Sequence, residues 1–96
     1  GTLLGQFSVL GWEEYYTEPF AAVDSAGRIW LTDSRNNRVE IFGPDGTLLA
    51  IWSAKGFKPG DFNTPIGIFI ADGRVYVSDT HNHRVQVFAE KKIYRK

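Results

Sequence analysis

The chain has 96 residues, of which 43% are hydrophobic and 15% aromatic, and its 11 basic and 11 acidic residues balance to a net charge of zero. This composition indicates one small globular domain, and the absence of cysteine excludes disulfide frameworks, thiolate metal sites and cysteine nucleophiles. Four of the basic residues lie in the tail 91–96, so residues 1–90 carry a net charge of −4. A body of that sign is unfavourable for binding phosphate groups.

The predicted elements are short strands, because apolar, β-branched and aromatic residues come in short runs separated by glycine, aspartate, asparagine and proline. In chain order, strands are expected at 2–8, 20–23, 28–32, 38–42, 47–53, 66–71, 74–78 and 84–88. The turns at 24–27 and 72–73 contain Asp and Gly, which readily adopt a positive φ. The longest apolar stretch, 65–71, is too short to span a bilayer, and no signal-peptide pattern opens the chain.

The chain repeats itself. At an offset of 46, residues 19–42 and 65–88 are identical at eight of 24 positions. At an offset of 45, residues 1–11 and 46–56 are identical at six of 11 positions. Two copies of one unit of about 45 residues therefore account for nearly the whole chain.

The side chains indicate how the units pack. Large apolar residues point to both faces of the strands at 29–31 and 75–77, so each sheet must be covered on both sides. The first strand of each unit contains small residues (Ala21 and Ala22, or Gly67), which suits a place where many strands crowd around an axis. Four-stranded antiparallel units of this length stacked around a centre are typical of β-propellers. The expected fold is therefore all-β, with propeller blades at 20–53 and 66–88.

The stretches PFAAVDSAGRIWLTDSRNNRVEIF (19–42) and PIGIFIADGRVYVSDTHNHRVQVF (65–88) resemble NHL repeats. The pattern is a proline-led strand, a D-x-x-G turn, an aromatic-rich strand and then D-S/T-x-N-x-R-V-x-V/I-F. The matching positions are Asp33, Asn36, Arg38, Val39 and Phe42, and Asp79, Asn82, Arg84, Val85 and Phe88. The resemblance implies a propeller, usually six-bladed and used mostly for binding, whereas this chain holds two blades.

Two blades cannot close a ring, and an isolated pair would leave one apolar face open on each blade. The strand order makes 2–8 an outer strand without its own blade and leaves the blade at 66–88 without an outer strand. We therefore expect the N-terminal strand of each copy to complete a neighbour's last blade. The result would be a homo-oligomeric ring, a six-bladed trimer in preference to an eight-bladed tetramer.

An alternative is that the chain, which starts at Gly1 and contains no methionine, is an excised piece of a longer propeller. The basic tail 91–96 also has two interpretations. It is expected as a frayed terminus, or as the start of a competing outer strand, since it aligns with 45–50.

Six polar residues recur at equal spacing in the two units: Asp33, Asn36, Arg38, Asp79, Asn82 and Arg84. A single active site does not need a copy in every blade, so the repetition favours a structural role. We expect each carboxylate to accept backbone N–H groups from the following loop, and each guanidinium to bridge loop carbonyls or a neighbouring carboxylate.

His81 and His83 stand where the first unit has Arg35 and Asn37. The spacing sets no third ligand beside them, so solvated loop histidines are expected in preference to a metal site. The long loops before each proline, 10–18 and 55–64, share a face with the 33–37 loop in propellers. Their aromatic residues are candidates for a binding platform: Trp12, Tyr15, Tyr16, Phe57 and Phe62, although Trp12 and Phe57 are expected to wedge between blades. The candidate ligand-binding residues are Tyr15, Tyr16, Arg35, Lys58, His81 and His83.

The sequence contains no nucleophile elbow, phosphate-binding loop or HExxH motif, so a non-catalytic module for binding or assembly is expected, without a cofactor. Its expected partner is a second copy of itself, and an unknown protein or small molecule is a further candidate. The alternatives are a nucleic-acid-binding domain, which the acidic loop 10–18 disfavours, and a metal-assisted lyase or hydrolase. A membrane partner is not expected.

Overall fold

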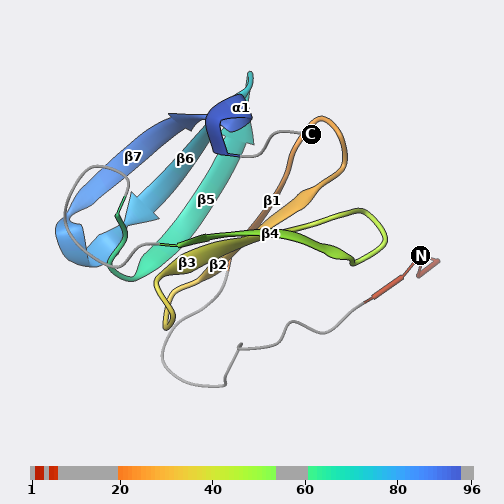
Figure 1. Ribbon diagram of the computed structural model, residues 1–96, viewed down its shortest axis with the longest axis horizontal. Helices are drawn as coiled ribbons and strands as arrows, with labels where there is room; N and C mark the ends of the chain where they lie inside the picture. Colours follow the sequence, from red (N-terminus) through yellow and green to blue (C-terminus); the bar gives the residue numbers. More distant parts are fainter. Residues whose placement is uncertain (1, 4, 7–19, 54–60, 94–96) are drawn as a thin grey trace.

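The computed structural model describes residues 2–3, 5–6, 20–53 and 61–93, and its regular structure is almost wholly β (Figure 1). The first sheet contains β1 (Ala21–Val23), β2 (Ile29–Asp33), β3 (Arg38–Phe42) and β4 (Leu48–Ser53). The second contains β5 (Pro65–Ala71), β6 (Arg74–Asp79) and β7 (Arg84–Ala89). A 3-10 turn, η1 (Thr80–Asn82), precedes β7, and a short helix, α1 (Glu90–Ile93), follows it. The predicted all-β fold is confirmed.

Both sheets are antiparallel meanders in which neighbours along the chain are neighbours in the sheet. They differ in their first turns. Val23 pairs with Ile29 across a five-residue connection, whereas Ala71 pairs with Arg74 across the two-residue turn Asp72-Gly73, whose φ angles are 51° and 73°. Positive φ at both turn positions matches the right-handed twist of the flanking strands. The longer first turn makes room for Asp24, which the second unit lacks at this place.

The hydrophobic core lies between the two sheets. Trp30, Val39 and Ile41 of the first sheet and Phe62, Val75 and Val77 of the second unit are all fully buried there. Trp52 of β4 joins the two sides, because its ring centroid lies 4.7 Å from that of Phe62 and 4.5 Å from that of Phe88. Burial of each such aromatic side chain contributes about 1.5–3 kcal/mol, so this layer holds the two sheets together.

Phe62 corrects one prediction. It was a candidate for an exposed binding platform, but it is fully buried and its ring contacts Trp52 and Phe88 edge to face. The sequence placed it in a polar loop, and only the approach of the first sheet turns that loop position into core.

The structure describes only part of each end of the chain. Residues 2–3 and 5–6 are in no strand, and the rest of the predicted strand 2–8 lies outside the described residues. The alternative that the tail 91–96 begins a competing outer strand is wrong for residues 91–93, which belong to α1 (Glu90–Ile93). The Glu90 N–H donates to the Gly73 carbonyl at 2.9 Å, and the Glu90 carboxylate pairs with Arg28 at 3.2 Å, so the chain is turned across the end of the sheets. Residues 94–96 lie outside the described residues.

Within the described ranges, no helix has the length and apolar character needed to cross a membrane.

Candidate functional site

The same face of the repeat is buried in one sheet and open in the other. We call it the front face: in the first sheet it carries Trp30, Val39 and Ile41, which are fully buried against the second sheet. At the offset of 46, the counterparts of Val39 and Ile41 are Val85 and Val87, which are 62% and 52% exposed. The second sheet therefore presents to solvent a surface that the first sheet uses as core.

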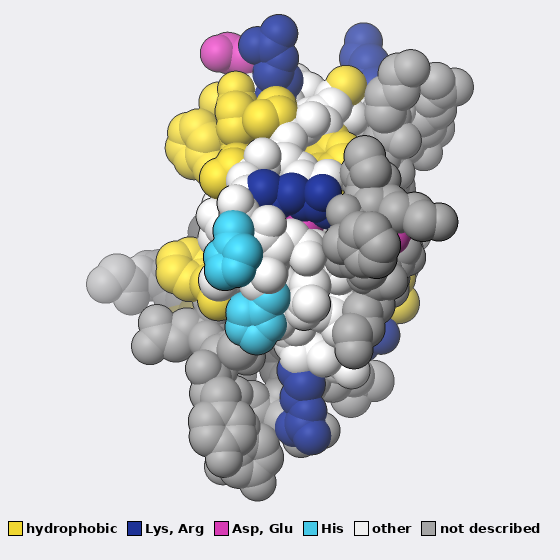
Figure 2. All heavy atoms as spheres, turned by 90° about the vertical axis from the view of Figure 1, so that its left-hand side faces the viewer, with side chains coloured by type: hydrophobic (Ala, Val, Ile, Leu, Met, Phe, Trp, Pro, Cys, Tyr) yellow, Lys and Arg dark blue, Asp and Glu magenta, His cyan; other side chains and the backbone are white. Residues whose placement is uncertain are grey.

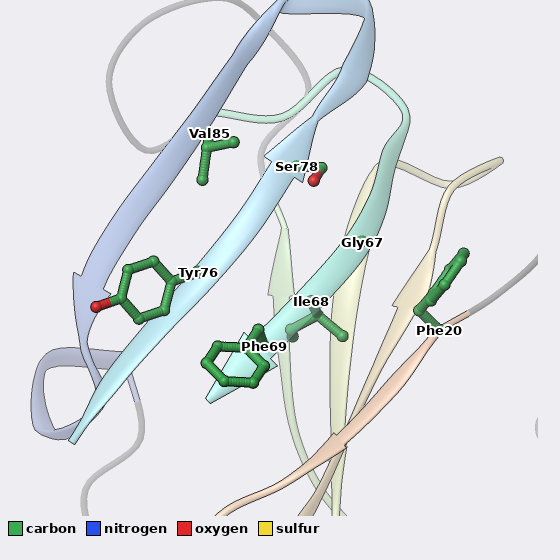
Figure 3. A pocket seen from close by; sticks show the side chains of 7 residues that line it. All are labelled: Phe20, Gly67, Ile68, Phe69, Tyr76, Ser78 and Val85. Atoms are coloured by element: carbon green, nitrogen blue, oxygen red, sulfur yellow. The ribbon is translucent and has the colours of Figure 1, made fainter. Parts of the chain in front are cut away.

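A hollow of about 280 Å³ lies on this open front face (Figure 3). It is lined by Phe20, Gly67, Ile68, Phe69, Tyr76, Ser78 and Val85. Phe69 and Tyr76 are cross-strand neighbours whose ring centroids are 6.0 Å apart, and Figure 3 shows Phe20 across the hollow from them. A Cβ added at Gly67 would lie only 2.9 Å from Ser78 Oγ, so a larger residue there would disturb the hollow. Its mostly apolar walls suit a hydrophobic side chain better than a charged group.

The opposite, back face of the first sheet is only partly covered. Val23 of β1 and Ile51 of β4 are 61% and 49% exposed, whereas Leu31 and Phe42 are buried. In the second sheet, the back-face residues Val75 and Val77 are the counterparts of Ile29 and Leu31, and they are packed against the first sheet. The two sheets thus contact each other front to back.

A buried carboxylate organises the loops at one end of the second sheet. Asp79 is fully buried, and its Oδ2 accepts hydrogen bonds from the side chains of Asn82, Arg84 and Gln86 at 2.9, 2.8 and 3.1 Å. Its Oδ1 accepts the backbone N–H of Asn63 at 2.6 Å. The backbone donor therefore comes from the segment before β5, whereas the loop after β6 contributes the side-chain amide of Asn82.

Arg84 and Gln86 carry this network further. Each donates to the Asp61 carbonyl, at 3.0 Å from Arg84 Nη2 and 2.7 Å from Gln86 Nε2. Burial by itself would raise the pKa of Asp79, but the hydrogen bonds from Asn63, Asn82 and Arg84 outweigh it and hold that pKa below the ordinary value. The carboxylate is therefore kept ionised as a stable anchor for segment 61–63.

The first sheet has the matching cluster. Asp33 Oδ2 accepts from Asn36 Nδ2 at 3.0 Å and from Arg38 Nε at 2.9 Å. The difference lies at Glu40, the counterpart of Gln86, which is buried. Its Oε2 lies 3.4 Å from Arg38 Nη2, and its Oε1 accepts no hydrogen bond from the part of the chain that the structure describes. Burial raises the pKa of Glu40, and the nearby Asp33 carboxylate adds to that, against the attraction of Arg38.

The loops of the two repeats meet at Thr64. Its N–H donates to Asn37 Oδ1 at 2.8 Å, and its hydroxyl lies 3.0 Å from His81 Nδ1. Asn37 and His83 occupy equivalent places and both have left-handed backbone, with φ of 55° and 54°. Asn tolerates this conformation better than most residues, and this explains why an asparagine occupies position 37.

The two histidines lie at the surface, and Figure 2 shows their imidazoles beside hydrophobic side chains on the side of the second sheet. Across the described ranges, no group of three or more His, Cys, Asp or Glu side chains is placed to hold a metal ion.

Comparison with known families decides what the repeat is. The model of the NHL repeat matches residues 20–42 and 62–88, which together make up more than half of the chain. The chain belongs to the NHL-repeat family. No curated protein in the comparison matches it. The resemblance seen in the sequence is confirmed, and the two sheets are blades of the β-propeller type.

Only three of the six predicted ligand-binding residues lie in the described part of the NHL repeats. Arg35 is exposed in the loop between β2 and β3 of the first repeat, and His81 and His83 are exposed in the corresponding part of the second. Tyr15, Tyr16 and Lys58 lie outside the described residues, as do Trp12 and Phe57. The structure therefore brings His81 together with Thr64, and it does not assemble the six predicted ligand-binding residues into one described site.

Sequence reasoning missed the role of a further buried carboxylate in the first NHL repeat, that of Asp24. Asp24 Oδ2 accepts from Trp30 Nε1 at 2.9 Å and from Arg28 Nε at 2.6 Å, and its Oδ1 accepts the backbone N–H of Ala26 and Arg28. Burial opposes ionisation, but these hydrogen bonds outweigh it and lower the pKa of Asp24. Trp30 could have indicated this role in the sequence. A buried indole N–H needs a hydrogen-bond acceptor, and Asp24 directly follows the neighbouring strand β1.

Proposed function

We propose that this chain is a non-catalytic NHL-repeat propeller module that completes its ring by self-association. In this proposal, residues 2–8 of each copy serve as the outer strand of a neighbour's second sheet. The observation that carries it is the unequal completion of the two sheets. β3 pairs with β4, whereas no strand in the described ranges pairs with the outer edge of β7, the counterpart of β3.

The chain has a segment suited to that edge. Residues 1–4 and 46–49 share the sequence GTLL, and 47–53 includes all of β4. Leu3 is 73% exposed and outside any strand in the single chain, so it is available to a neighbour. An open strand edge promotes pairing with another chain, which a closed ring satisfies. Three copies would give six blades, the number usual in the family, and four would give eight.

The polar clusters support a structural assignment. In both repeats the Asp side chain accepts hydrogen bonds from the Asn of the loop that follows it and from the Arg that begins the next strand. We therefore assign a role in holding the loops in place to Asp33, Asn36, Arg38, Asp79, Asn82 and Arg84. Ligand binding at Tyr15, Tyr16, Arg35, Lys58, His81 and His83 stays a prediction. No observation favours the nucleic-acid or metal-assisted alternatives.

The mass in solution tests the proposal. Gel filtration with light scattering should give about three times the chain mass of 10.8 kDa. Deletion of residues 1–8 should give a monomer. A synthetic peptide of residues 1–11 should bind to this truncated chain at the open edge of β7. The same peptide with Leu3→Pro is the control, since proline removes a backbone donor from the ladder. A stable monomer of the intact chain would overturn the proposal.

A further inference from the structure

We propose that Arg28 holds α1 in a clasp, which directs the chain after β7 across the end of the second sheet instead of back along the edge of β7. The clasp consists of the Glu90–Arg28 ion pair and the Glu90–Gly73 hydrogen bond. The inference rests on the proposed function, because a strand from another copy needs an open edge at β7. It adds the device by which the chain keeps this edge open.

The two repeats leave their third strand in different ways. After β3, the Gly43 N–H donates to the Thr47 carbonyl at 2.8 Å and the Gly46 N–H donates to the Gly43 carbonyl at 2.9 Å, so the chain returns as β4. Gly46 has a φ of 89° in this turn, and its counterpart in the second repeat is Lys92. A side chain makes that backbone conformation unfavourable. The second repeat therefore lacks the glycine on which the return to a fourth strand depends.

Glu90 begins α1, which Figure 1 shows at the end of the second sheet, and it is fixed at two points. Its N–H donates to the Gly73 carbonyl at 2.9 Å, and its Oε2 lies 3.2 Å from Arg28 Nη2. The side chains of Arg28 and Glu90 are only 15% and 13% exposed. Because solvent and salt screen such a pair less than an exposed one, we expect it to hold α1 more firmly than a surface ion pair would.

Arg28 is in turn held by the core of the first sheet. Its Nε donates to Asp24 Oδ2 at 2.6 Å, and the same oxygen accepts the Trp30 indole N–H at 2.9 Å. The side chains of Asp24 and Trp30 are fully buried. A guanidinium donates in several fixed directions, so one arginine can bind the buried carboxylate and that of Glu90 at once. Four side chains therefore connect the core to α1 in series: Trp30, Asp24, Arg28 and Glu90.

Each half of the clasp occurs once in the chain. The connection between β1 and β2 has five residues and contains Asp24, whereas the matching turn of the second sheet consists of Asp72 and Gly73 alone. The counterpart of Glu90 in the first repeat is Pro44. The contact is therefore specific to the junction of the two repeats and is not a feature that each repeat carries.

The clasp determines what lies beside β7. Residues 90–93 are held across the end of the second sheet, and no strand in the described ranges pairs with the outer edge of β7. The missing glycine makes a return along this edge unfavourable, and the clasp holds the chain away from it. If the clasp opens, the residues after Ala89 are released and can obstruct the edge. The closed clasp therefore favours association, and its loss should weaken it.

Two substitutions in the full chain open the clasp from opposite sides. Glu90→Gln removes the anion, and Arg28→Lys replaces a guanidinium that spans two carboxylates with a single ammonium. Asp72→Asn, at an exposed position next to Gly73, removes the same charge outside the clasp and is the matched control.

Opening is measured by the rate of trypsin cleavage after Lys91, which is exposed. Each clasp variant should be cleaved about tenfold faster than the unsubstituted chain, the effect of losing one hydrogen bond to a charged group, and the double variant no faster than either. Arg28→Lys leaves the residues around the cleaved bond unchanged, so it controls for the effect of Glu90 itself on trypsin. The NMR signal of the Trp30 indole N–H should shift in Glu90→Gln and not in Asp72→Asn.

The effect on the edge is measured by light scattering over a range of protein concentrations. The concentration at which half of the chain is associated should rise in Glu90→Gln and stay unchanged in Asp72→Asn. Cleavage rates that do not change, or that add in the double variant, would overturn the clasp. Unchanged association with an opened clasp would overturn its role at β7. A monomeric unsubstituted chain contradicts the proposed function itself, while trypsin cleavage and NMR still decide whether the clasp exists.

Discussion

The first and second sheets are built from the same repeat, yet their front faces have opposite environments. Val39 is fully buried, whereas its counterpart Val85 is 62% exposed. Both are valine, so the residue does not explain the difference. The neighbour does: the second sheet covers the first, and within one chain nothing described covers the second. The comparison shows that the same apolar front face is core where a second sheet covers it and surface where, among the described residues, none does.

The Asp33 and Asp79 clusters, by contrast, are alike in the two repeats. Asp33 with Arg38 and Asp79 with Arg84 have the same geometry, with Nε to Oδ2 distances of 2.9 and 2.8 Å. The Asn and Arg partners that the two clusters share lie within five residues of each carboxylate, so this part of the arrangement is local and forms in both repeats regardless of what covers the sheet.

The largest expected effect contrasts Trp30 with its counterpart Tyr76. Trp30→Ala removes a fully buried ring between the sheets and should lower the free energy of unfolding by about 3–5 kcal/mol. Tyr76→Ala should cost the single chain only about 1 kcal/mol, since this face has no second layer. Urea denaturation measures both. The midpoint for the unsubstituted chain should rise with protein concentration, and that dependence should vanish in Tyr76→Ala. Equal large losses in the two variants would contradict the difference between the faces.

The next comparison is between the carboxylates. Asp79 accepts four donors and is fully buried, so Asp79→Asn should cost about 3 kcal/mol by leaving Arg84 without its anion. Asp33→Asn should cost about half of that, because two of its contacts are described. Thermal unfolding at neutral pH measures the difference, and a larger loss at Asp33 would reverse our ranking.

Acid should lower the free energy of unfolding through protonation of Asp79 and Asp24. The pKa values of Asp79 and Asp24 are lowered in the folded state from 3.8, so the folded state binds fewer protons than the unfolded state as pH falls below that value. Their contribution to stability is complete above this range and is lost as pH falls through the lowered pKa values. Asp79→Asn should therefore flatten the acid limb of stability against pH; an unchanged limb would contradict the shift.

The smallest effect is expected from exchanging Glu40 and Gln86, the equivalent residues at which the two clusters differ. Glu40 has a raised pKa, above 4.5, so the folded state holds its proton more tightly and stability falls as pH rises through that window. Glu40→Gln should remove this slope and stabilise the chain by about 1 kcal/mol at pH 7, with little gain at pH 4. The reverse exchange, Gln86→Glu, places a carboxylate beside Asp79 and should destabilise increasingly as pH rises. A pH-independent effect of Glu40→Gln would argue against a raised pKa of the buried Glu40 carboxyl.

Several features were accessible to sequence reasoning because they depend on local chemistry. Strand positions follow from apolar runs between turn residues, and all seven described strands lie within two residues of their predicted bounds. The repeated Asp, Asn and Arg residues identified the family for the same reason. Phe62 and α1 were missed, because the burial of the first depends on Trp52 and the second is held by Gly73 and Arg28, all distant in sequence.

By itself, the sequence determined the repeat, the strands, the turns and the family, since these depend on residue types a few positions apart. Only the tertiary structure decided which apolar face is core and which is surface, because burial depends on the neighbour that arrives from far along the chain. It also showed that the two sheets stack front to back, because the apolar residues of both sheets share one core.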